Sequence, residues 1–196
     1  MSSTNRGYDR HKSDYYATPV EDIKSFLKEF TTGFDQIIDL DNFNFTKNLD
    51  ILDPCAGDLA YSKAIKEYGF PDYNDIKTLD IRGDSLADIK ADYLSWTPDK
   101  QYDLIISNPP FYLAIDFIRK ALQDVKDGGL VIMLLRLNFL GSQERLPFWK
   151  DNMANAAFVH SKRMKFIAGK SGDSCEYAHF VWQKGNQTDF CKLKVI

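Results

Sequence analysis

Short runs of apolar residues alternate along the chain with longer stretches in which apolar side chains recur every three or four positions. The short runs cover residues 49–52, 76–79, 104–107 and 130–135, and they have the length and composition of buried strands. Residues 59–68 and 114–125, which lie between these runs, show helical spacing. Strands that alternate with helices are typical of a parallel sheet, so the pattern predicts an α/β fold.

The two ends of the chain follow a different pattern. Thr18, Pro19 and Glu21 predict a helix start, as N-cap, first helical residue and capping-box partner, and the helix should end near Gly33. Residues 157–159 and 177–182 resemble strands with a polar loop and no helix between them, which predicts a closing antiparallel hairpin. We therefore expect a mostly parallel sheet of seven strands with helices on both faces.

Composition indicates a single domain of ordinary size. The 196 residues are 44% hydrophobic and 14% aromatic, enough for one core, which we expect residues 14–196 to form after a flexible polar segment at residues 1–13. Three widely spaced cysteines predict neither a disulfide scaffold nor a metal site, and they fit a reducing, cytoplasmic location. The longest apolar run, residues 130–135, is far too short to span a membrane.

The net charge of −3 conceals an asymmetry between the two parts of the chain. Residues 1–135 carry a net charge of −8 and residues 136–196 a net charge of +5. The acidic part suits a cofactor with hydroxyl and amine groups, and the basic part suits contact with a polyanion. A solvated charged face explains the same charges equally well.

Two predicted strands end in carboxylates, at the sheet edge where open α/β folds bind ligands. After the first strand, Asp53 suits a ligand ammonium group and Gly57 allows a close turn, although an ordinary strand-to-helix turn needs the same glycine. Asp80 ends the second strand 23 residues after Gly57, where a carboxylate can accept the hydroxyls of a ribose. The phosphate-binding pattern G-x-G-x-x-G is missing, which favours a nucleoside cofactor without phosphates. Asp92 then suits the adenine amine of that cofactor or, more simply, closes a turn.

The third strand ends in Asn108-Pro109-Pro110-Phe111. Two successive prolines end the strand and make the backbone rigid, so that Asn108 offers a side-chain oxygen and Pro109 a carbonyl from fixed positions. Two acceptors that hold the hydrogens of a planar amine favour its nucleophilic form, and the ring of Phe111 can stack on a base. A plain proline-rich loop explains the prolines but not the asparagine and the aromatic residue beside them.

In this order, the motifs resemble those of the S-adenosylmethionine-dependent N6-adenine DNA methyltransferases, in the small stand-alone form that phages and mobile elements encode. The resemblance spans about residues 14–135: residues 15–19 are similar to the N-terminal cofactor motif, residues 53–58 to the first strand loop and residues 108–111 to the catalytic tetrapeptide. It implies a Rossmann-like methyltransferase fold, S-adenosylmethionine as the cofactor, and direct transfer with no covalent intermediate and no metal. It also implies catalysis by Asn108, Pro109, Pro110 and Phe111, and cofactor contact by Tyr16, Thr18, Asp53, Gly57, Asp80, Asp92 and Asn108.

Three features qualify the resemblance. Leu59 stands where the family usually has a second glycine, and we expect it to narrow the approach of the cofactor's methionine part. Thr18 has two predicted roles, helix cap and cofactor contact, which are compatible if the loop before the helix closes over the cofactor. The residues after the motifs are too few for a separate target-recognition domain, so we expect modest specificity, or specificity from a partner subunit or a second copy.

The substrate that the resemblance implies is the N6 amine of adenine in DNA. Cations interleaved with an aromatic residue in the basic part suit phosphate contact and base stacking, although a solvated loop is the plainer interpretation. RNA adenine, a protein glutamine side chain, or a non-catalytic partner subunit with the same fold are the alternatives. The candidate nucleic-acid contacts are Arg136, Arg145, Lys162, Arg163, Lys165, Phe166 and Lys170.

Overall fold

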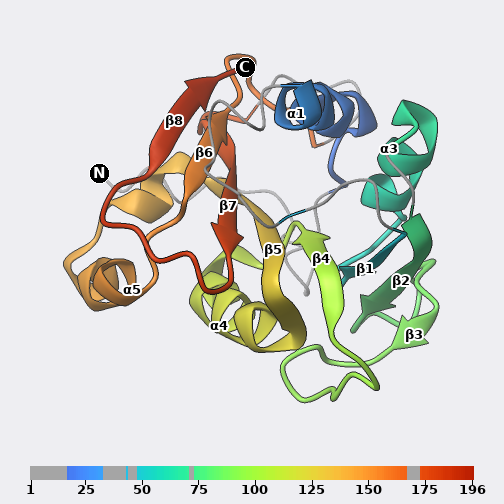
Figure 1. Ribbon diagram of the computed structural model, residues 1–196. Coiled ribbons are helices and arrows are strands. Elements are labelled where there is room, and N and C mark those ends of the chain that lie inside the picture. Colours follow the sequence, from blue (N-terminus) through green and yellow to red (C-terminus); the bar gives the residue numbers. More distant parts are fainter. Residues whose placement is uncertain (1–16, 33–42, 44–47, 71–72, 167–172) are drawn as a thin grey trace.

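In the described part of the chain, the sheet has eight strands in the order β3-β2-β1-β4-β5-β7-β6-β8 (Figure 1). The computed structural model describes residues 17–32, 43, 48–70, 73–166 and 173–196. Neighbouring strands from β3 to β5 are parallel, β7 is antiparallel to both β5 and β6, and β8 is parallel to β6. The strands are β1 (Leu49–Asp53), β2 (Tyr73–Asp80), β3 (Ile89–Lys90), β4 (Tyr102–Ser107), β5 (Val125–Arg136), β6 (Ala156–Val159), β7 (Tyr177–Gln183) and β8 (Lys192–Val195).

Helices cover both faces of the sheet and close two apolar cores. On one face lie α1 (Val20–Thr32) and α3 (Ala60–Tyr68), and on the other lie α4 (Ala114–Asp124) and α5 (Leu146–Asp151) (Figure 1). The side chains of β4 alternate between them, because Leu104 and Ile106 pack under α1 and α3 while Ile105 packs under α4. No helix in the described part of the chain is long and apolar enough to cross a membrane.

The architecture confirms the predicted α/β fold with a mostly parallel sheet and a closing antiparallel pair, while the expected number of seven strands is wrong. Two strands, β3 and β8, have no counterpart in the hydrophobic pattern. The first is two residues long. The second lies at the edge of the sheet, where Leu193 and Val195 are exposed, so no buried face marks it in the sequence.

The first helix begins slightly later than predicted. Val20 is its first residue, and the carbonyl of Pro19 accepts hydrogen bonds from the backbone N–H groups of Asp22 (3.1 Å) and Ile23 (3.2 Å). Its apolar positions are buried as the helical spacing predicts. The predicted end near Gly33, like the flexible segment at residues 1–13, lies outside the described residues.

Candidate active site

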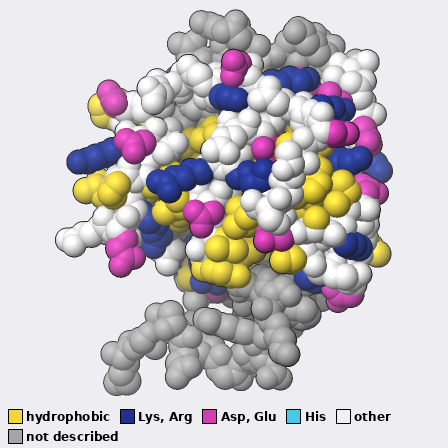
Figure 2. Space-filling model, turned by 90° about the horizontal axis from the view of Figure 1, so that it is seen from below, with side chains coloured by type: hydrophobic (Ala, Val, Ile, Leu, Met, Phe, Trp, Pro, Cys, Tyr) yellow, Lys and Arg dark blue, Asp and Glu magenta, His cyan; other side chains and the backbone are white. Residues whose placement is uncertain are grey.

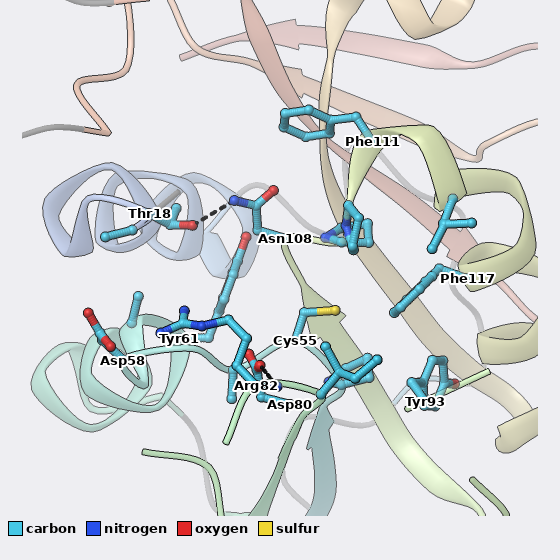
Figure 3. Close-up of a pocket in the computed structure, with 18 of the residues that line it drawn as sticks. Thr18, Cys55, Asp58, Tyr61, Asp80, Arg82, Tyr93, Asn108, Phe111 and Phe117 are labelled. Atoms are coloured by element: carbon cyan, nitrogen blue, oxygen red, sulfur yellow. Dashed lines mark hydrogen bonds between the residues drawn. The ribbon is translucent and has the colours of Figure 1, made fainter. Parts of the chain in front are cut away.

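The carboxyl ends of β1, β2 and β4 meet at a cavity of about 540 Å³ (Figure 3). A cavity of this size at this edge is typical of ligand sites in open α/β sheets. Most of the predicted catalytic and cofactor-binding residues in the described part of the chain line it, together with several residues that the sequence did not single out. The predicted ones on the wall are Thr18, Asp80, Asp92, Asn108, Pro109, Pro110 and Phe111.

The turn after β1 is tied to the end of β2 by Asp80. One oxygen of this carboxylate accepts from the backbone N–H of Gly57 (2.8 Å), and the other accepts from that of Arg82 (2.8 Å). Gly57 has a φ of 50°, a conformation that favours glycine. Gly57 is not on the cavity wall itself, but its neighbours Ala56 and Asp58 are. Asp80 therefore fixes the turn that the resemblance assigns to the cofactor while it faces the cavity.

Leu59, the departure from the family pattern, also adopts a left-handed conformation, with φ 65° and ψ 36°. This conformation costs a non-glycine residue about 1–2 kcal/mol, which explains why a glycine suits the position. Leu59 does not line the cavity. The structure therefore gives no sign of the expected narrowing, and the substitution acts on the backbone energy of the turn.

Asp53 differs from the other predicted carboxylates, because the structure does not place it on the cavity wall. Its side chain is fully buried and accepts hydrogen bonds from Ser107 Oγ (2.6 Å) and the backbone N–H of Cys55 (3.3 Å). The second carboxylate oxygen has no partner among the described residues. Burial raises the pKa of Asp53 to about 7, and the negative charge of Asp80 acts in the same direction.

Asp92 closes a turn at the cavity, which is one of its two predicted roles. Its carboxylate accepts from the backbone N–H of Leu94 (3.0 Å), and its carbonyl accepts from the N–H groups of Ser95 and Trp96, which is the hydrogen bonding of a turn. The same residue lies on the cavity wall, beside the buried Tyr93. Asp92 is thus rigidly held where a ligand can reach it.

Asn108 lies at the end of β4, opposite the start of α1. Its Nδ2 donates to Thr18 Oγ1 at 3.0 Å, and the two side chains point toward one another (Figure 3). Its Oδ1 is buried and has no hydrogen-bond partner among the described residues. The hydroxyl of Thr18 therefore makes a contact that neither the cap nor the cofactor prediction included. Beyond Pro110, the backbone turns at once into a 3₁₀ helix that begins at Phe111.

Phe111 is held between two side chains from the far part of the sequence. The guanidinium of Arg136 lies 4.9 Å from the centre of its ring, and the ring of Tyr177 lies 5.8 Å away. Arg136 in turn donates to Tyr177 Oη (3.2 Å) and lies 3.7 Å from the carboxylate of Asp173. Arg136 is off the cavity wall, so the structure uses this predicted phosphate contact to hold Phe111 in place.

The remaining candidate nucleic-acid contacts fall into two groups. Lys162, Arg163 and Lys165 are exposed and form a shallow groove against Pro19 and Asp22, close to Thr18. The Arg163 guanidinium is 3.6 Å from the carboxylate of Glu176.

The second group packs inward. Phe166 lies with its ring 4.9 Å from that of Tyr177. Arg145 donates to the carbonyl of Phe139 (3.2 Å) and lies over the ring of that residue. Arg145 is therefore engaged within the fold, away from the groove. Tyr16 and Lys170 lie outside the described residues.

Several wall residues have no counterpart in the sequence interpretation. Tyr112 is 74% exposed at the cavity, and the Tyr61 hydroxyl is hydrogen-bonded to Nε2 of the buried His179 (3.0 Å). Cys55 faces the cavity (Figure 3), and burial raises the pKa of its thiol well above the usual range, so it is no thiolate nucleophile. Cys55 belongs to the motif at residues 53–58 and Tyr61 to the helical pattern at residues 59–68, but neither pattern assigned them a role at a site. The wall also contains Asp58, Lys63 and Arg82.

No cluster of three or more His, Cys, Asp or Glu side chains suited to a metal ion occurs among the described residues. The described wall of the cavity offers hydrogen-bond acceptors and aromatic rings, together with the cations Lys63 and Arg82. Carboxylates lie on the side of β1 and β2, and an amide oxygen and a ring lie on the side of β4.

No protein-family model matches the sequence, and no curated protein is similar to it at a significant level. Solved structures do match in fold. A protein from Listeria monocytogenes, assigned to the class I S-adenosylmethionine-dependent methyltransferases, is 16% identical, with a TM-score of 0.64 over 92% of this chain and 65% of its own. A protein from Pyrococcus horikoshii, assigned as an RNA methyltransferase, is 15% identical, with a TM-score of 0.62 over 93% and 94%.

A third structure, the methyltransferase subunit of a type I restriction-modification system from Streptococcus thermophilus, is 12% identical. Its TM-score is 0.65, over 92% of this chain and 47% of that subunit. At such identities the similarity is one of fold. The chain has the Rossmann-like fold of the class I S-adenosylmethionine-dependent methyltransferases. Within that class, the named neighbours include an RNA methyltransferase and a restriction-modification subunit.

Proposed function

We propose that the chain transfers a methyl group from S-adenosylmethionine to the N6 amine of adenine in DNA. One observation carries the proposal: Asn108, which lines the same cavity as Asp80 and Asp92, has a buried carboxamide oxygen, Oδ1, with no partner among the described residues. The rigid Pro109 and the ring of Phe111 line the cavity beside it. Acceptors beside a flat ring suit an aromatic amine, and carboxylates suit a nucleoside.

The cavity fits the proposed cofactor. Its volume of about 540 Å³ lies in the usual range for small-molecule sites. Asp80 and Asp92 offer carboxylate oxygens to ribose hydroxyls and an adenine amine, and the phosphate-free cofactor matches the missing glycine-rich cradle. When bound, S-adenosylmethionine supplies a methyl group on a positively charged sulfur, which an amine can take directly.

The residues of β4 would act on the amine. A ring-bound amine is a poor nucleophile because its lone pair is delocalised into the ring. Hydrogen bonds from its two N–H groups to Asn108 Oδ1 and the carbonyl of Pro109 favour the form in which the lone pair is localised. Stacking on Phe111 would hold the base after it has left the helix.

Charge favours a nucleic acid as the substrate. The exposed cations Lys162, Arg163 and Lys165 lie close to Thr18, on the side where the base would enter. By contrast, Figure 2 shows the face seen from below, where β4 begins, with Lys and Arg interspersed among Asp and Glu. A polyanion meets no uniform field there, so we place the nucleic acid at the carboxyl edge of the sheet.

RNA adenine is the second candidate, and one observation favours it. The chain spans 94% of the Pyrococcus protein assigned as an RNA methyltransferase, but 47% of the restriction-modification subunit. A partner subunit or a second copy would supply target specificity under either candidate.

The test is incubation with labelled S-adenosylmethionine and four substrates: single-stranded DNA, duplex DNA, RNA and a glutamine-containing peptide. We expect N6-methyladenine in DNA, with Asn108→Ala as the inactive control. Label in RNA alone would replace the first candidate with the second, and label in the peptide alone would overturn both. Cofactor binding without transfer to any substrate would indicate a non-catalytic subunit.

A further inference from the structure

Thr18 and Asn108 are 90 positions apart in the sequence and come together at the cavity. The Nδ2 group of Asn108 donates to Thr18 Oγ1 at 3.0 Å, and Thr18 is 7% exposed (Figure 3). The Oδ1 atom of the same carboxamide is buried and has no hydrogen-bond partner among the described residues. One half of this amide is thus engaged with Thr18, and the other half has an unmet hydrogen-bonding capacity at the cavity wall.

The orientation of the amide decides what it can do. A carboxamide has nearly the same shape after a half-turn about its last side-chain bond, but the turn exchanges an acceptor for a donor. With Oδ1 toward the ligand, it accepts a hydrogen from an amine. With Nδ2 toward the ligand, the N–H groups of the amide face those of the amine, and the two donors repel each other.

We propose that Thr18 is a positioning residue that selects the productive orientation of the Asn108 carboxamide; the inference rests on the proposed amine methylation. The hydroxyl of Thr18 has one proton to donate and lone pairs to accept with. As long as it accepts from Nδ2, Oδ1 faces the ligand. Thr18 also lines the cavity, so its own proton is available to an acceptor group of the bound cofactor. A hydroxyl that donates to the cofactor must accept from Asn108, and cofactor binding thereby favours the orientation that the target amine needs.

The kinetic test uses two substitutions that differ in one group. Thr18→Val keeps the shape of the side chain and removes the hydroxyl, whereas Thr18→Ser keeps the hydroxyl. At saturating S-adenosylmethionine, Thr18→Val should lower kcat about tenfold, equal to roughly 1.4 kcal/mol in the barrier, with KM for the oligonucleotide nearly unchanged. Thr18→Ser should stay within about twofold of the natural chain. Equal losses for both variants would overturn the proposal.

A second pair of variants, made in a chain that carries Asn108→Asp, separates the effect of Thr18 on the amide orientation from every other role of Thr18. Asn108→Asp places an oxygen at both ends of the group, so no orientation needs to be selected. In that background, Thr18→Val should change kcat less than about twofold. The same tenfold loss in both backgrounds would mean that Thr18 acts on the cofactor or the fold alone, and the proposal would fail.

A measurement that needs no catalytic turnover tests the contact between Thr18 and Asn108 independently of the proposed function. It also replaces the kinetic comparison if Asn108→Asp is inactive. The side-chain N–H signals of Asn108 can be followed by nuclear magnetic resonance in the ligand-free protein, assigned by their loss in Asn108→Asp. They should exchange with solvent several-fold faster in Thr18→Val than in Thr18→Ser. Equal exchange in the two folded variants would overturn the inference. If no substrate is methylated while the exchange rates differ as expected, the proposed function fails and the contact stands.

Discussion

The two sides of the cavity hold their functional groups in different ways. On the side of β1 and β2, the carboxylates of Asp80 and Asp92 accept hydrogen bonds from backbone N–H groups of nearby turns. On the side of β4, Asn108 and Phe111 are held by side chains from distant parts of the chain, Thr18 and Arg136. The first side is therefore held by backbone groups of turns and the second by side chains, and both arrangements depend on the assembled sheet.

The difference explains what each side is suited to do. Backbone N–H groups fix a carboxylate without neutralising its charge, so it can accept from a ligand as well. A side-chain amide held by one hydroxyl keeps its second polar atom unpaired. Under the proposed function, the carboxylate side would hold the cofactor and the amide would orient the target amine.

The largest expected effect concerns Asp53, at the base of the carboxylate side. Its pKa is raised to about 7, so between about pH 4 and pH 7 the folded chain keeps a proton that the unfolded chain has released. The stability that this proton contributes is fully present below about pH 4. It is lost as the pH rises through 7, by roughly 4 kcal/mol in all.

Asp53→Asn should remove this pH dependence, because the amide stays neutral. Urea unfolding between pH 4 and pH 8 should show a free energy of unfolding that falls less steeply with pH in the variant than in the natural chain. Asp75→Asn, an exposed change at the opposite end of β2, is the matched control and should leave the slope unaltered. Parallel curves for the natural chain and Asp53→Asn would show that Asp53 is charged in the folded state.

On the amine side, Asn108→Ala should lower kcat by about a hundredfold or more. The oxygen that it removes acts on the amine as its nucleophilicity rises, so the affinity for S-adenosylmethionine in calorimetry should change little. Rate and cofactor affinity should separate in this variant. Retained turnover would contradict amine methylation through Asn108 for any of the substrates.

On the side of β1 and β2, we expect a substitution to change the affinity for the cofactor. Asp80→Ala should weaken S-adenosylmethionine binding by roughly 1.5–3 kcal/mol, the worth of hydrogen bonds to a charged group. The loss of the Gly57 and Arg82 N–H contacts adds to the effect by loosening the turn. Calorimetry should measure the affinity of Asp80→Ala and of the control variant Asp75→Ala for S-adenosylmethionine. Equal affinities in the two folded variants would mean that the ribose binds elsewhere.

The smallest expected effect concerns the basic groove beside Thr18. Changing Lys162 and Lys165 together to Ala should reduce the slope of log affinity against log salt for an oligonucleotide by up to about two units, with little change in sequence preference. Arg145→Gln should leave the slope alone, since Arg145 is engaged with Phe139. A peptide-methylating enzyme would show no such salt dependence, and a reduced slope in Arg145→Gln would reverse the assignment of the two groups of cations.

Much of the fold follows from local patterns that the sequence contains in full. The apolar runs of β1, β4 and the core of β5, and the helical spacing of α1, α3 and α4, each depend on a few neighbouring residues. The same holds for the turns after β1 and β2, where Gly57 and Asp80 stand at the ends of predicted strands. Edge strands escape this reasoning because their side chains stay exposed, as in β8.

The tertiary structure alone decided which polar groups are buried, paired or available. Asp53 and Asp80 both end a strand in the sequence, yet the fold buries the first away from the cavity wall and turns the second toward it. Arg136 and Arg145 both count as cations in the composition. In the fold, the guanidinium of Arg136 packs on the ring of Phe111, and that of Arg145 packs on the ring of Phe139.

The sequence by itself determined that an amide, two prolines and an aromatic ring follow a buried strand in an α/β fold, because each of those features is written in adjacent residues. The contact of Thr18 with Asn108 was decided only when α1 packed against the end of β4. Hydrogen bonds, desolvation and ion pairs depend on distances of a few ångströms between segments far apart in the chain. No local pattern contains those distances.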